Sequence, residues 1–359
     1  MRIGVDAREI AGRATGVGRY VSGLLHQWST SRDAKPHEFV LYAPSALSIG
    51  LDTRRFATRE VTGTGGTYWE QVQLPAVIAR DHLDVWFAPA YSMPLRLRIP
   101  AVLAIHDLSF VAHPEWFRLR EGARRRLLTH RSSQKARAIV TISEFSRREL
   151  VERLGVPHDR IHVIPPGVDS PLTAAASGAL RGNHVLYVGS IFNRRHVPDL
   201  IRAFATVARR SADVSLDIVG DNRSHPSENI PRVIAGEQIE QQAQWHRYVS
   251  DERLHELFSQ ARAFAFLSEY EGLGLPPLEA LAAGVPPVVL DTEVARESCL
   301  EAALYVAPGD LPGIARALET ALFNEHERTR ILAHAPSVVA RYNWPDAAAR
   351  ILRLLESVA

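Results

Sequence analysis

The most regular feature of the chain is an alternation of short apolar runs with segments in which apolar residues recur every three or four positions. A buried run of four to six apolar residues is typical of a strand covered on both faces of a parallel sheet. Helical spacing between such runs predicts that helices provide the cover. In the first half the predicted strands are Met1–Asp6, Phe39–Tyr42, Val85–Ala88, Ala101–Ile105 and Ala138–Thr141, and Tyr20–Trp28 is a predicted helix.

The same alternation restarts after residues 165–182, which are rich in Pro, Gly, Ser and Ala and show no periodic apolar face. Such a composition is typical of a linker. We therefore expect two doubly wound domains, with a ligand bound between them outside the carboxyl ends of the strands. The predicted elements of the second half are strands His184–Val188, Ser215–Val219, Ala263–Leu267 and Val285–Leu290, and helices Pro198–Arg210, Asp251–Ala261 and Asp346–Val358.

The composition narrows the classes of protein to consider. The chain has 359 residues, is 46% hydrophobic and 23% charged, and carries a net charge of only +2, so no nucleic acid partner is indicated. Its lysines are Lys35 and Lys135, neither in a context typical of a pyridoxal-phosphate Schiff base, and no phosphate-binding P-loop motif is present. The single Cys299 excludes an internal disulfide and a cysteine-based zinc site.

The sequence shows neither a membrane-spanning segment nor a signal peptide. No apolar stretch approaches the roughly 18 to 20 residues that a membrane span requires. The first residues have the pattern of a strand and not of a signal peptide, so we expect a cytoplasmic protein.

The run E-G-L-G-L-P-P-L-E, from Glu271 to Glu279, is the most informative motif. It follows a predicted strand and leads into a helix, and its two carboxylates lie about two helical turns apart. The Gly-Leu-Gly-Leu stretch offers backbone N–H groups at a helix start, which suits an anion. Carboxylates for hydroxyls beside amides for phosphate predict a pocket for a nucleotide diphosphate sugar, although Glu279 at a plain helix start would be the structural alternative.

Two glycines in T-G-V-G-R-Y stand between the first predicted strand and the helix after it. Gly16 and Gly18 permit a close backbone approach to a phosphate or a sugar. The dinucleotide-binding fingerprint is not met, because Val21 occupies the place of its third small residue. A tight strand-to-helix turn explains the same glycines without any ligand.

Two further motifs follow predicted strands. In V-G-S-I-F-N-R-R-H, Arg194 and Arg195 arrive together, and paired guanidinium groups stabilise the charge of a departing diphosphate. In I-H-D-L-S-F, His106 is placed to hydrogen-bond a transferred sugar. The structural alternatives are a solvated arginine pair and a buried structural histidine.

If Glu271 and Arg195 bind the donor, changing either to Ala should cut turnover severely and leave the fold intact.

A basic segment follows Trp116 and Phe117. The stretch Arg118–Arg137 suits contact with an anionic bilayer, which would bring a lipid-linked acceptor to the site, or is simply a solvated helix face. Two adjacent aromatic residues, Tyr68 and Trp69, could stack on an acceptor sugar, and core packing explains them equally well.

Taken together, these motifs resemble the retaining glycosyltransferase family 4, whose GT-B fold consists of two Rossmann-like α/β domains facing across a cleft. The strongest part is Ser268–Val289, which resembles the family's signature of two glutamates with seven residues between them. Residues 69–75, 106–117, 141–150 and 164–169 resemble members that act in bacterial surface-polysaccharide assembly. The family often reads Arg-Lys-Asn where this chain has Arg194, Arg195 and His196.

The resemblance implies an acceptor-binding domain at residues 1–170 and a donor-binding domain at residues 171–345, with the helix at 346–359 packing back on the first. It implies that Glu271, His106 and Arg195 act in catalysis and that Asp107 lies near the acceptor, with no metal ion or cofactor required. The implied donor-binding residues are Gly16, Gly18, Ser190, Arg194, Arg195, Tyr248, Gly272, Leu273, Gly274, Leu275 and Glu279.

The expected reaction is transfer of a hexose or deoxyhexose, mannose being favoured, with retention at the anomeric carbon. The donor is a nucleotide diphosphate sugar such as GDP-mannose, a dTDP-deoxysugar or a UDP-hexose, and the acceptor is a glycan or a polyprenyl-linked saccharide. The basic segment adds the expectation of a peripheral contact at the inner face of the cell membrane. A nucleotide-sugar epimerase on the same fold and a non-catalytic nucleotide-sugar-binding protein are the alternatives.

Overall fold

The chain divides into two compact units. The structure, a computed structural model, describes residues 1–12, 16–48, 50–169 and 182–359. The N-terminal unit consists of residues 1–167 together with 342–359, and the C-terminal unit of residues 168–341. Residues 170–181 of the predicted linker at 165–182, and with them the predicted domain boundary at residue 170, lie outside the described residues.

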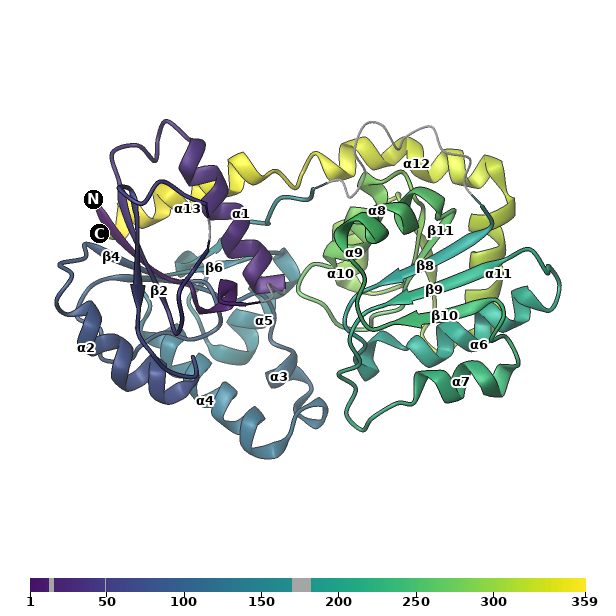
Figure 1. The fold of residues 1–359 in the computed structure, drawn as a ribbon, viewed down its shortest axis with the longest axis horizontal. Helices are drawn as coiled ribbons and strands as arrows, with labels where there is room; N and C mark the ends of the chain where they lie inside the picture. The colour runs from purple at the N-terminus through teal and green to yellow at the C-terminus, as the bar shows by residue number, and fades with distance from the viewer. Residues whose placement is uncertain (13–15, 49, 170–181) are drawn as a thin grey trace. The chain divides into compact units, whose positions relative to one another are not determined.

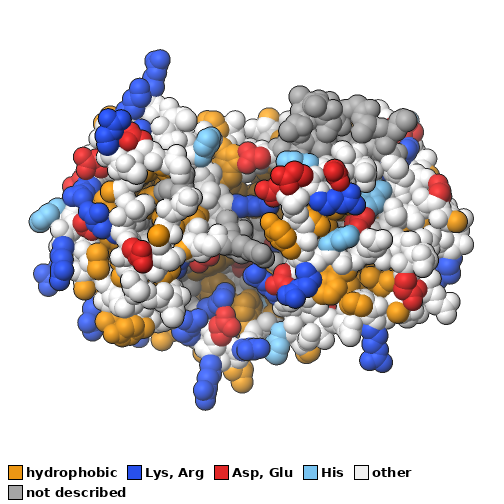
Figure 2. Space-filling model, in the orientation of Figure 1, with side chains coloured by type: hydrophobic (Ala, Val, Ile, Leu, Met, Phe, Trp, Pro, Cys, Tyr) orange, Lys and Arg blue, Asp and Glu red, His pale blue; other side chains and the backbone are white. Residues whose placement is uncertain are grey.

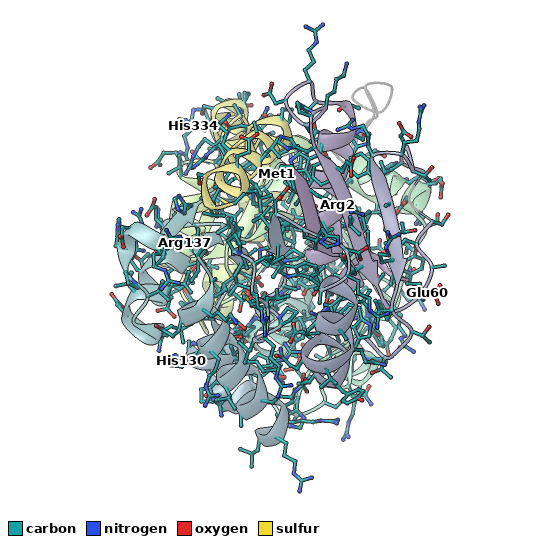
Figure 3. All side chains as sticks on the ribbon, turned by 90° about the vertical axis from the view of Figure 1, so that its left-hand side faces the viewer. Met1, Arg2, Glu60, His130, Arg137 and His334 are labelled. Atoms are coloured by element: carbon teal, nitrogen blue, oxygen red, sulfur yellow. The ribbon has the colours of Figure 1, made fainter. Side chains whose placement is uncertain are left out.

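The N-terminal unit is built on a parallel seven-stranded sheet of order β3-β2-β1-β4-β5-β6-β7. In Figure 3, Glu60 in β3 and Arg137, just before β6, lie on opposite sides of Arg2 in β1, as this order requires. The strands are β1 (Arg2–Asp6), β2 (Glu38–Ala43), β3 (Phe56–Glu60), β4 (Val85–Ala88), β5 (Ala101–Ala104), β6 (Ala138–Thr141) and β7 (Ile161–Val163).

Helices cover both faces of this sheet, which explains why β4, β5 and β6 are buried throughout. One apolar core lies under α1 and α13, and the other under α2, α3 and α5. The helices of this unit are α1 (Gly16–Thr30), α2 (Leu74–Ile78), α3 (Ser109–Ala112), α4 (Leu119–Lys135), α5 (Glu144–Leu154) and α13 (Trp344–Val358).

The last helix returns to the N-terminal unit. In α13, Ala347, Ile351 and Leu355 belong to the same core as β1 and α1, and both chain termini lie in this unit (Figure 1). The ring of Trp344 packs so closely on Gly23 that a Cβ atom added there would lie 2.6 Å from it. The predicted helix at Asp346–Val358 is confirmed, and it begins two residues earlier.

The C-terminal unit repeats the architecture with six parallel strands in the order β10-β9-β8-β11-β12-β13. Figure 1 shows α6 and α7 along one side of this sheet and α8 and α9 on the other. The strands are β8 (His184–Val188), β9 (Ser215–Val219), β10 (Ala243–His246), β11 (Ala263–Phe266), β12 (Pro287–Leu290) and β13 (Leu304–Val306). The helices are α6 (Val197–Ala208), α7 (Ile230–Glu237), α8 (Asp251–Gln260), α9 (Leu275–Ala282), α10 (Glu293–Cys299), α11 (Leu311–Phe323) and α12 (Glu325–Val339).

Both sheets have the doubly wound order, in which the chain runs outward over its first three strands and then returns to add the later strands on the other side of the first strand. The reversal lies between β1 and β4 in one unit and between β8 and β11 in the other. Ligands of such sheets bind outside the carboxyl ends of the strands at this reversal. The fold alone therefore points to the loops after β1 and β4, and to those after β8 and β11.

Candidate functional site

The loops after β8 and β11 bring the predicted arginine pair and Glu271 together. Arg195 donates from Nε to Oε1 of Glu271 at 2.8 Å and from Nη1 to the carbonyl of Ser190 at 2.8 Å. Arg194 donates from Nε to the carbonyl of Tyr270 at 3.2 Å, and its guanidinium lies 4.5 Å from the ring of Phe192. Side chains from two loops that are 76 residues apart thus form one cluster.

Each partner of the central pair keeps hydrogen-bonding capacity. Ser268 donates to the same Oε1 of Glu271 at 2.9 Å, whereas Oε2 accepts from no described residue. Arg195 also interacts with the hydroxyl of Tyr187, and its well-aligned hydrogen bonds to described residues use Nε and Nη1 but not Nη2. A guanidinium carries five N–H donors and a carboxylate accepts about four hydrogen bonds, so the pair can bind a ligand without separating.

The electrostatics keep this pair ionised. Burial alone would raise the pKa of Glu271, but the charges of Arg195 and Arg194 outweigh it and hold that pKa below its usual value. The same burial raises the pKa of the adjacent Tyr187 to about 12, so its phenol stays neutral. The result is a fixed carboxylate and fixed cations at the carboxyl end of β8.

The start of α9 presents a run of backbone amides beside Glu271. Gly274 precedes the helix with φ +82°, in the left-handed region that favours glycine. Pro276 and Pro277 in the first turn have no N–H, so the donors at this end belong to the residues before them. The N–H groups of Leu273, Gly274 and Leu275 pair with no acceptor in the part of the chain that the structure describes.

Two glycines bring the backbone of β8 and β9 together beneath the arginines. Gly220 follows β9 with φ +152°, and a Cβ atom there would collide with the carbonyl oxygen of Gly189. Gly189 has φ +149°, and a Cβ atom there would lie 2.8 Å from Nη1 of Arg195. Both positions therefore require glycine, because a side chain would displace the turn that carries the arginine pair.

In the N-terminal unit, the loop after β1 carries a buried ion cluster that the sequence did not reveal. Arg8 donates from Nε to both oxygens of Asp6 at 3.0 and 2.9 Å and from Nη2 to Glu70 at 2.6 Å. Ser92, after β4, donates to Glu70 at 2.7 Å. The placement of Arg8 directly after the first strand, and of Glu70 in a segment that carries the family resemblance, were the available signals.

His106, after β5, is buried in the same unit. Its Nε2 lies 2.8 Å from the carbonyl oxygen of Pro89, and the rings of Tyr20 and Tyr91 pack edge-on against it at 4.7 and 5.7 Å. Burial lowers the pKa of His106, so a neutral ring is favoured. The neutral ring donates from Nε2 to Pro89, which assigns the acceptor role to Nδ1.

The predicted acceptor residues separate into exposed and buried positions. Trp69 is 1% exposed and lies in the apolar core, with the guanidinium of Arg8 at 5.0 Å from its ring. It therefore cannot stack on a sugar, and of the two explanations open from the sequence, core packing is correct. Tyr68 is 68% exposed, and Asp107 accepts from Tyr91 at 2.7 Å and from the N–H of Ser109 at 2.8 Å.

The remaining predicted residues lie at several places. Gly16 begins α1, and a Cβ atom there would meet nothing within 4 Å, whereas Gly18 is buried. Thr15, which precedes them, is outside the described residues. Tyr248 follows β10 and is exposed, and Glu279 lies half-buried in the second turn of α9.

Two sequence families match nearly the whole chain between them. The family "Glycosyltransferase Family 4" matches residues 14–170, and the family "Glycosyl transferases group 1" matches residues 175–338. Among curated proteins, the chain is 27% identical over 279 residues to the O-antigen chain mannosyltransferase B of Escherichia coli, covering 74% of this chain and 73% of that protein. It is 22% identical to the O-antigen chain mannosyltransferase RfbU of Salmonella typhimurium, covering 73% of this chain and 76% of that protein.

Solved structures agree with the fold. The sucrose-phosphate synthase of Thermosynechococcus elongatus superposes with a TM-score of 0.79 at 17% identity, covering 99% of this chain and 98% of that chain. WaaG, a glycosyltransferase involved in lipopolysaccharide biosynthesis, superposes with a TM-score of 0.72 at 16% identity, covering 99% of each chain. The two doubly wound units are thus the two domains of a GT-B glycosyltransferase. The chain is thus a glycosyltransferase, with a family 4 domain at residues 14–170 and a group 1 domain at residues 175–338.

Two other features are absent from the described residues, a membrane-spanning helix and a metal cluster. Within the described part of the chain, no helix combines the length and apolarity that crossing a bilayer requires. The same residues contain no group of three His, Cys, Asp or Glu side chains arranged to hold a metal ion.

Proposed function

We propose that this glycosyltransferase moves a hexose from a nucleotide diphosphate sugar to a glycan or lipid-linked saccharide, with retention at the anomeric carbon. The observation that carries the proposal is the Arg195–Glu271 pair at the strand reversal of the C-terminal unit, with Nη2 and Oε2 open to a ligand among the described residues. A diphosphate requires cations and N–H donors, and a sugar requires hydroxyl acceptors. This cluster supplies both.

In the proposed step, the bond between the anomeric carbon and the diphosphate oxygen breaks while an acceptor oxygen bonds to that carbon on the same face. The acceptor's proton passes to the departing phosphate oxygen, so no separate base is needed. Arg194 and Arg195 stabilise the negative charge that grows on the diphosphate. These guanidinium groups take the role that a metal ion would otherwise have, and the proposal requires no metal and no cofactor.

The other proposed donor contacts are those that the family resemblance implies. Oε2 of Glu271 would accept from a sugar hydroxyl, while the amides of Leu273, Gly274 and Leu275 would donate to phosphate or sugar oxygens. Glu279 would accept from the ribose hydroxyls, and Ser190 and Tyr248 would border the nucleotide. From the N-terminal unit, His106 would contact the sugar and Gly16 and Gly18 the phosphates.

Mannose is the proposed sugar, in surface-polysaccharide synthesis. Two relatives reported above are O-antigen chain mannosyltransferases, which supports this choice. An epimerase on the same fold would convert the donor without any acceptor, and a silent binding protein would leave it unchanged. Family membership and the ionised Arg195–Glu271 pair both favour group transfer over these alternatives.

The experiment is a thermal-shift screen of GDP-mannose, dTDP-rhamnose and UDP-glucose, because a ligand of the native state raises the melting temperature. We expect a rise with GDP-mannose, and a much smaller one for Arg195→Met. NMR of the product formed with a lipid-linked mannoside should show the donor's anomeric configuration. No shift with any nucleotide sugar, or an inverted product, would contradict the proposal, and conversion without acceptor would favour the epimerase.

For the acceptor, the proposal includes contact between the protein and an anionic bilayer through α4 and the segment at residues 68–72. Leu119 and Leu127 of α4 are 86% and 54% exposed, and Tyr68 and Val72 are also exposed. Figure 2 shows hydrophobic side chains together at the lower left, with arginine and lysine beside them. Apolar side chains flanked by basic ones suit the interface of an anionic membrane.

Sedimentation with vesicles tests this contact. We expect binding to phosphatidylglycerol vesicles and not to phosphatidylcholine vesicles, and loss of binding for Leu119→Ser/Leu127→Ser. Phe323→Ser, a change at an exposed apolar residue of α11, is the matched control. Equal sedimentation of all three proteins would leave the alternative of a solvated helix face.

A further inference from the structure

His196 lies between two carboxylates at the edge of the donor site. Its Nδ1 is 3.5 Å from Oδ2 of Asp199, and its Nε2 is 3.3 Å from Oε2 of Glu269. The Nε2 atom is buried and makes no well-aligned hydrogen bond, so its attraction to Glu269 is one between charges. A neutral imidazole carries one N–H and an imidazolium two, so both attractions operate together only when the ring is protonated.

The contact with Glu269 continues a series that ties the turn at 193–196 to the loop at 268–271. The N–H of Glu269 donates to the carbonyl of Arg194 at 2.9 Å, and Nε of Arg194 donates to the carbonyl of Tyr270 at 3.2 Å. The Arg195–Glu271 pair follows at 2.8 Å. His196 and Glu269 therefore lie next to the contacts that fix the arginine pair, and on the same two segments.

The backbone explains how the ring is held in this place. His196 has φ +45° and ψ +39°, in the left-handed region, directly before α6. Its carbonyl accepts from the N–H groups of Asp199 and Leu200, both at 3.0 Å, so the start of the helix fixes its backbone. Asparagine tolerates the left-handed region as well as histidine does. An asparagine here should keep the turn and remove the charge.

We propose that His196 is a positioning residue, whose charged ring holds the loop of Glu269 and Glu271 against the Arg194–Arg195 turn and so keeps the diphosphate site formed. This inference rests on the proposed function, since it concerns the same site. A protein with an uncharged side chain in place of His196 would lack this positioning role. It makes the affinity for diphosphate depend on pH through a residue that does not touch the ligand.

Several other charged groups surround His196. Asp199 also accepts from Arg202 at 2.9 Å, which shares its charge. Glu228, from the loop after β9, faces the ring as well; burial raises the pKa of Glu228, and a hydrogen bond from Asn193 and the charge of His196 act against that rise. Arg194 and Arg195 are the nearest cations on the same turn. Carboxylates from three segments thus surround one imidazole, which lies where it can bridge the turn and the loop.

The test is the dissociation constant of GDP, with UDP as a second probe, from pH 5.5 to 8.5 for the wild-type protein and for His196→Asn. The phosphate of the probe titrates equally in both proteins, so the ratio of their constants isolates the residue. Partly exposed ion pairs contribute modestly, and we expect His196→Asn to bind about two- to fivefold more weakly at pH 5.5. The ratio should fall toward 1 as the pH is raised to 8.5, because both attractions require the second ring proton.

Three controls make the result decisive. Glu269→Gln should reproduce the profile of His196→Asn, and the double variant should add nothing further. His255→Asn, at an exposed histidine of α8, should match the wild type at every pH. A ratio that does not change with pH would overturn the positioning role while leaving the donor site in place. Failure of the wild-type protein to bind GDP or UDP at any pH would instead overturn the proposed function itself.

Discussion

Arg195 and Glu271 are joined by a 2.8 Å hydrogen bond across the carboxyl ends of β8 and β11, and each has one side open to a ligand among the described residues. The carboxylate orients the guanidinium, and the guanidinium keeps the carboxylate ionised. Because one face of each group is used internally, the open faces point to the site in a fixed orientation. Shape, in addition to charge, is therefore required of both residues.

Glu271→Gln should lower kcat/KM by at least about 100-fold, as expected when a group that stabilises the transition state is lost. It also leaves the guanidinium of Arg195 buried without its counter-charge, and the free energy of unfolding should fall by about 3 kcal/mol. The expectation from the sequence, lost turnover with an intact fold, thus needs revision. Denaturant unfolding of Arg195→Met/Glu271→Gln should show recovered stability without recovered turnover. Equal loss of stability in the single and double variants would contradict this.

Gly16→Ala separates a structural from a ligand-binding role for that glycine. A Cβ atom at Gly16 meets nothing within 4 Å, and no positive φ constrains the residue. We expect an unchanged melting temperature and a several-fold weaker donor affinity, because the added methyl would obstruct only an incoming ligand. Thermal unfolding and donor titration on the same preparation check both parts. Unchanged affinity would remove Gly16 from the donor site.

Gly220→Ala should strongly destabilise the C-terminal unit. Its Cβ atom would collide with the carbonyl of Gly189, and its φ of +152° is strained for alanine. We expect a loss of more than about 2 kcal/mol in urea unfolding, which follows from overpacking together with strain. Gly236→Ala is the matched control, since that glycine lies in α7 with open space around it and should gain about 0.5 to 1 kcal/mol. If Gly220→Ala and Gly236→Ala had similar effects on the free energy of unfolding, the turn after β9 would have to accommodate a side chain without strain.

The buried His106 predicts a loss of stability in acid. Its pKa in the folded protein lies below the ordinary value of 6.5, because burial disfavours the charged ring. Above that ordinary value the ring is neutral in both states and has no effect. As the pH falls from 6.5 toward the lower folded pKa, the unfolded chain takes up a proton that the native state does not, and stability is lost. His106→Gln should reduce this loss in urea titrations between pH 5 and 8, whereas His130→Gln, an exposed change, should not.

Cys299 should be unreactive in the native protein. Burial raises the pKa of its thiol to about 11, so only about one molecule in a thousand carries the reactive thiolate at pH 8. Ellman's reagent should therefore label the native protein very slowly and label one equivalent at once in guanidinium chloride. Cys299→Ser gives the background rate. Rapid native labelling would indicate that α10 opens easily.

The sequence predicted the strands of the two sheets where apolar runs are longest. Val85–Ala88, Ala138–Thr141, His184–Val188 and Ser215–Val219 are confirmed at both ends. Phe56–Glu60 was not predicted, because this edge strand alternates buried and exposed residues over only five positions. Ala243–His246 was not predicted as a strand either, since it contains a single fully buried residue.

The site was predictable where chemistry follows a strand directly. Arg195 and Glu271 stood out because each comes a few residues after an apolar run, and the structure joins them. Arg8 and Glu70 were missed, because their contact links segments 62 residues apart. Trp69 shows the opposite limit, since an aromatic residue in a polar segment has no sequence mark that distinguishes a buried ring from an exposed one.

The return of α13 to the first sheet has a consequence for biosynthesis. Residues 1–167 leave the ribosome first, yet the apolar face of α1, with Leu24 and Trp28, stays uncovered until the last helix has been made. The C-terminal unit, by contrast, is continuous in the chain and can fold as soon as it emerges. The half of the enzyme that is translated first should thus be the half that matures last, and a released chain that ends before residue 344 would have a complete second domain beside an incomplete first one.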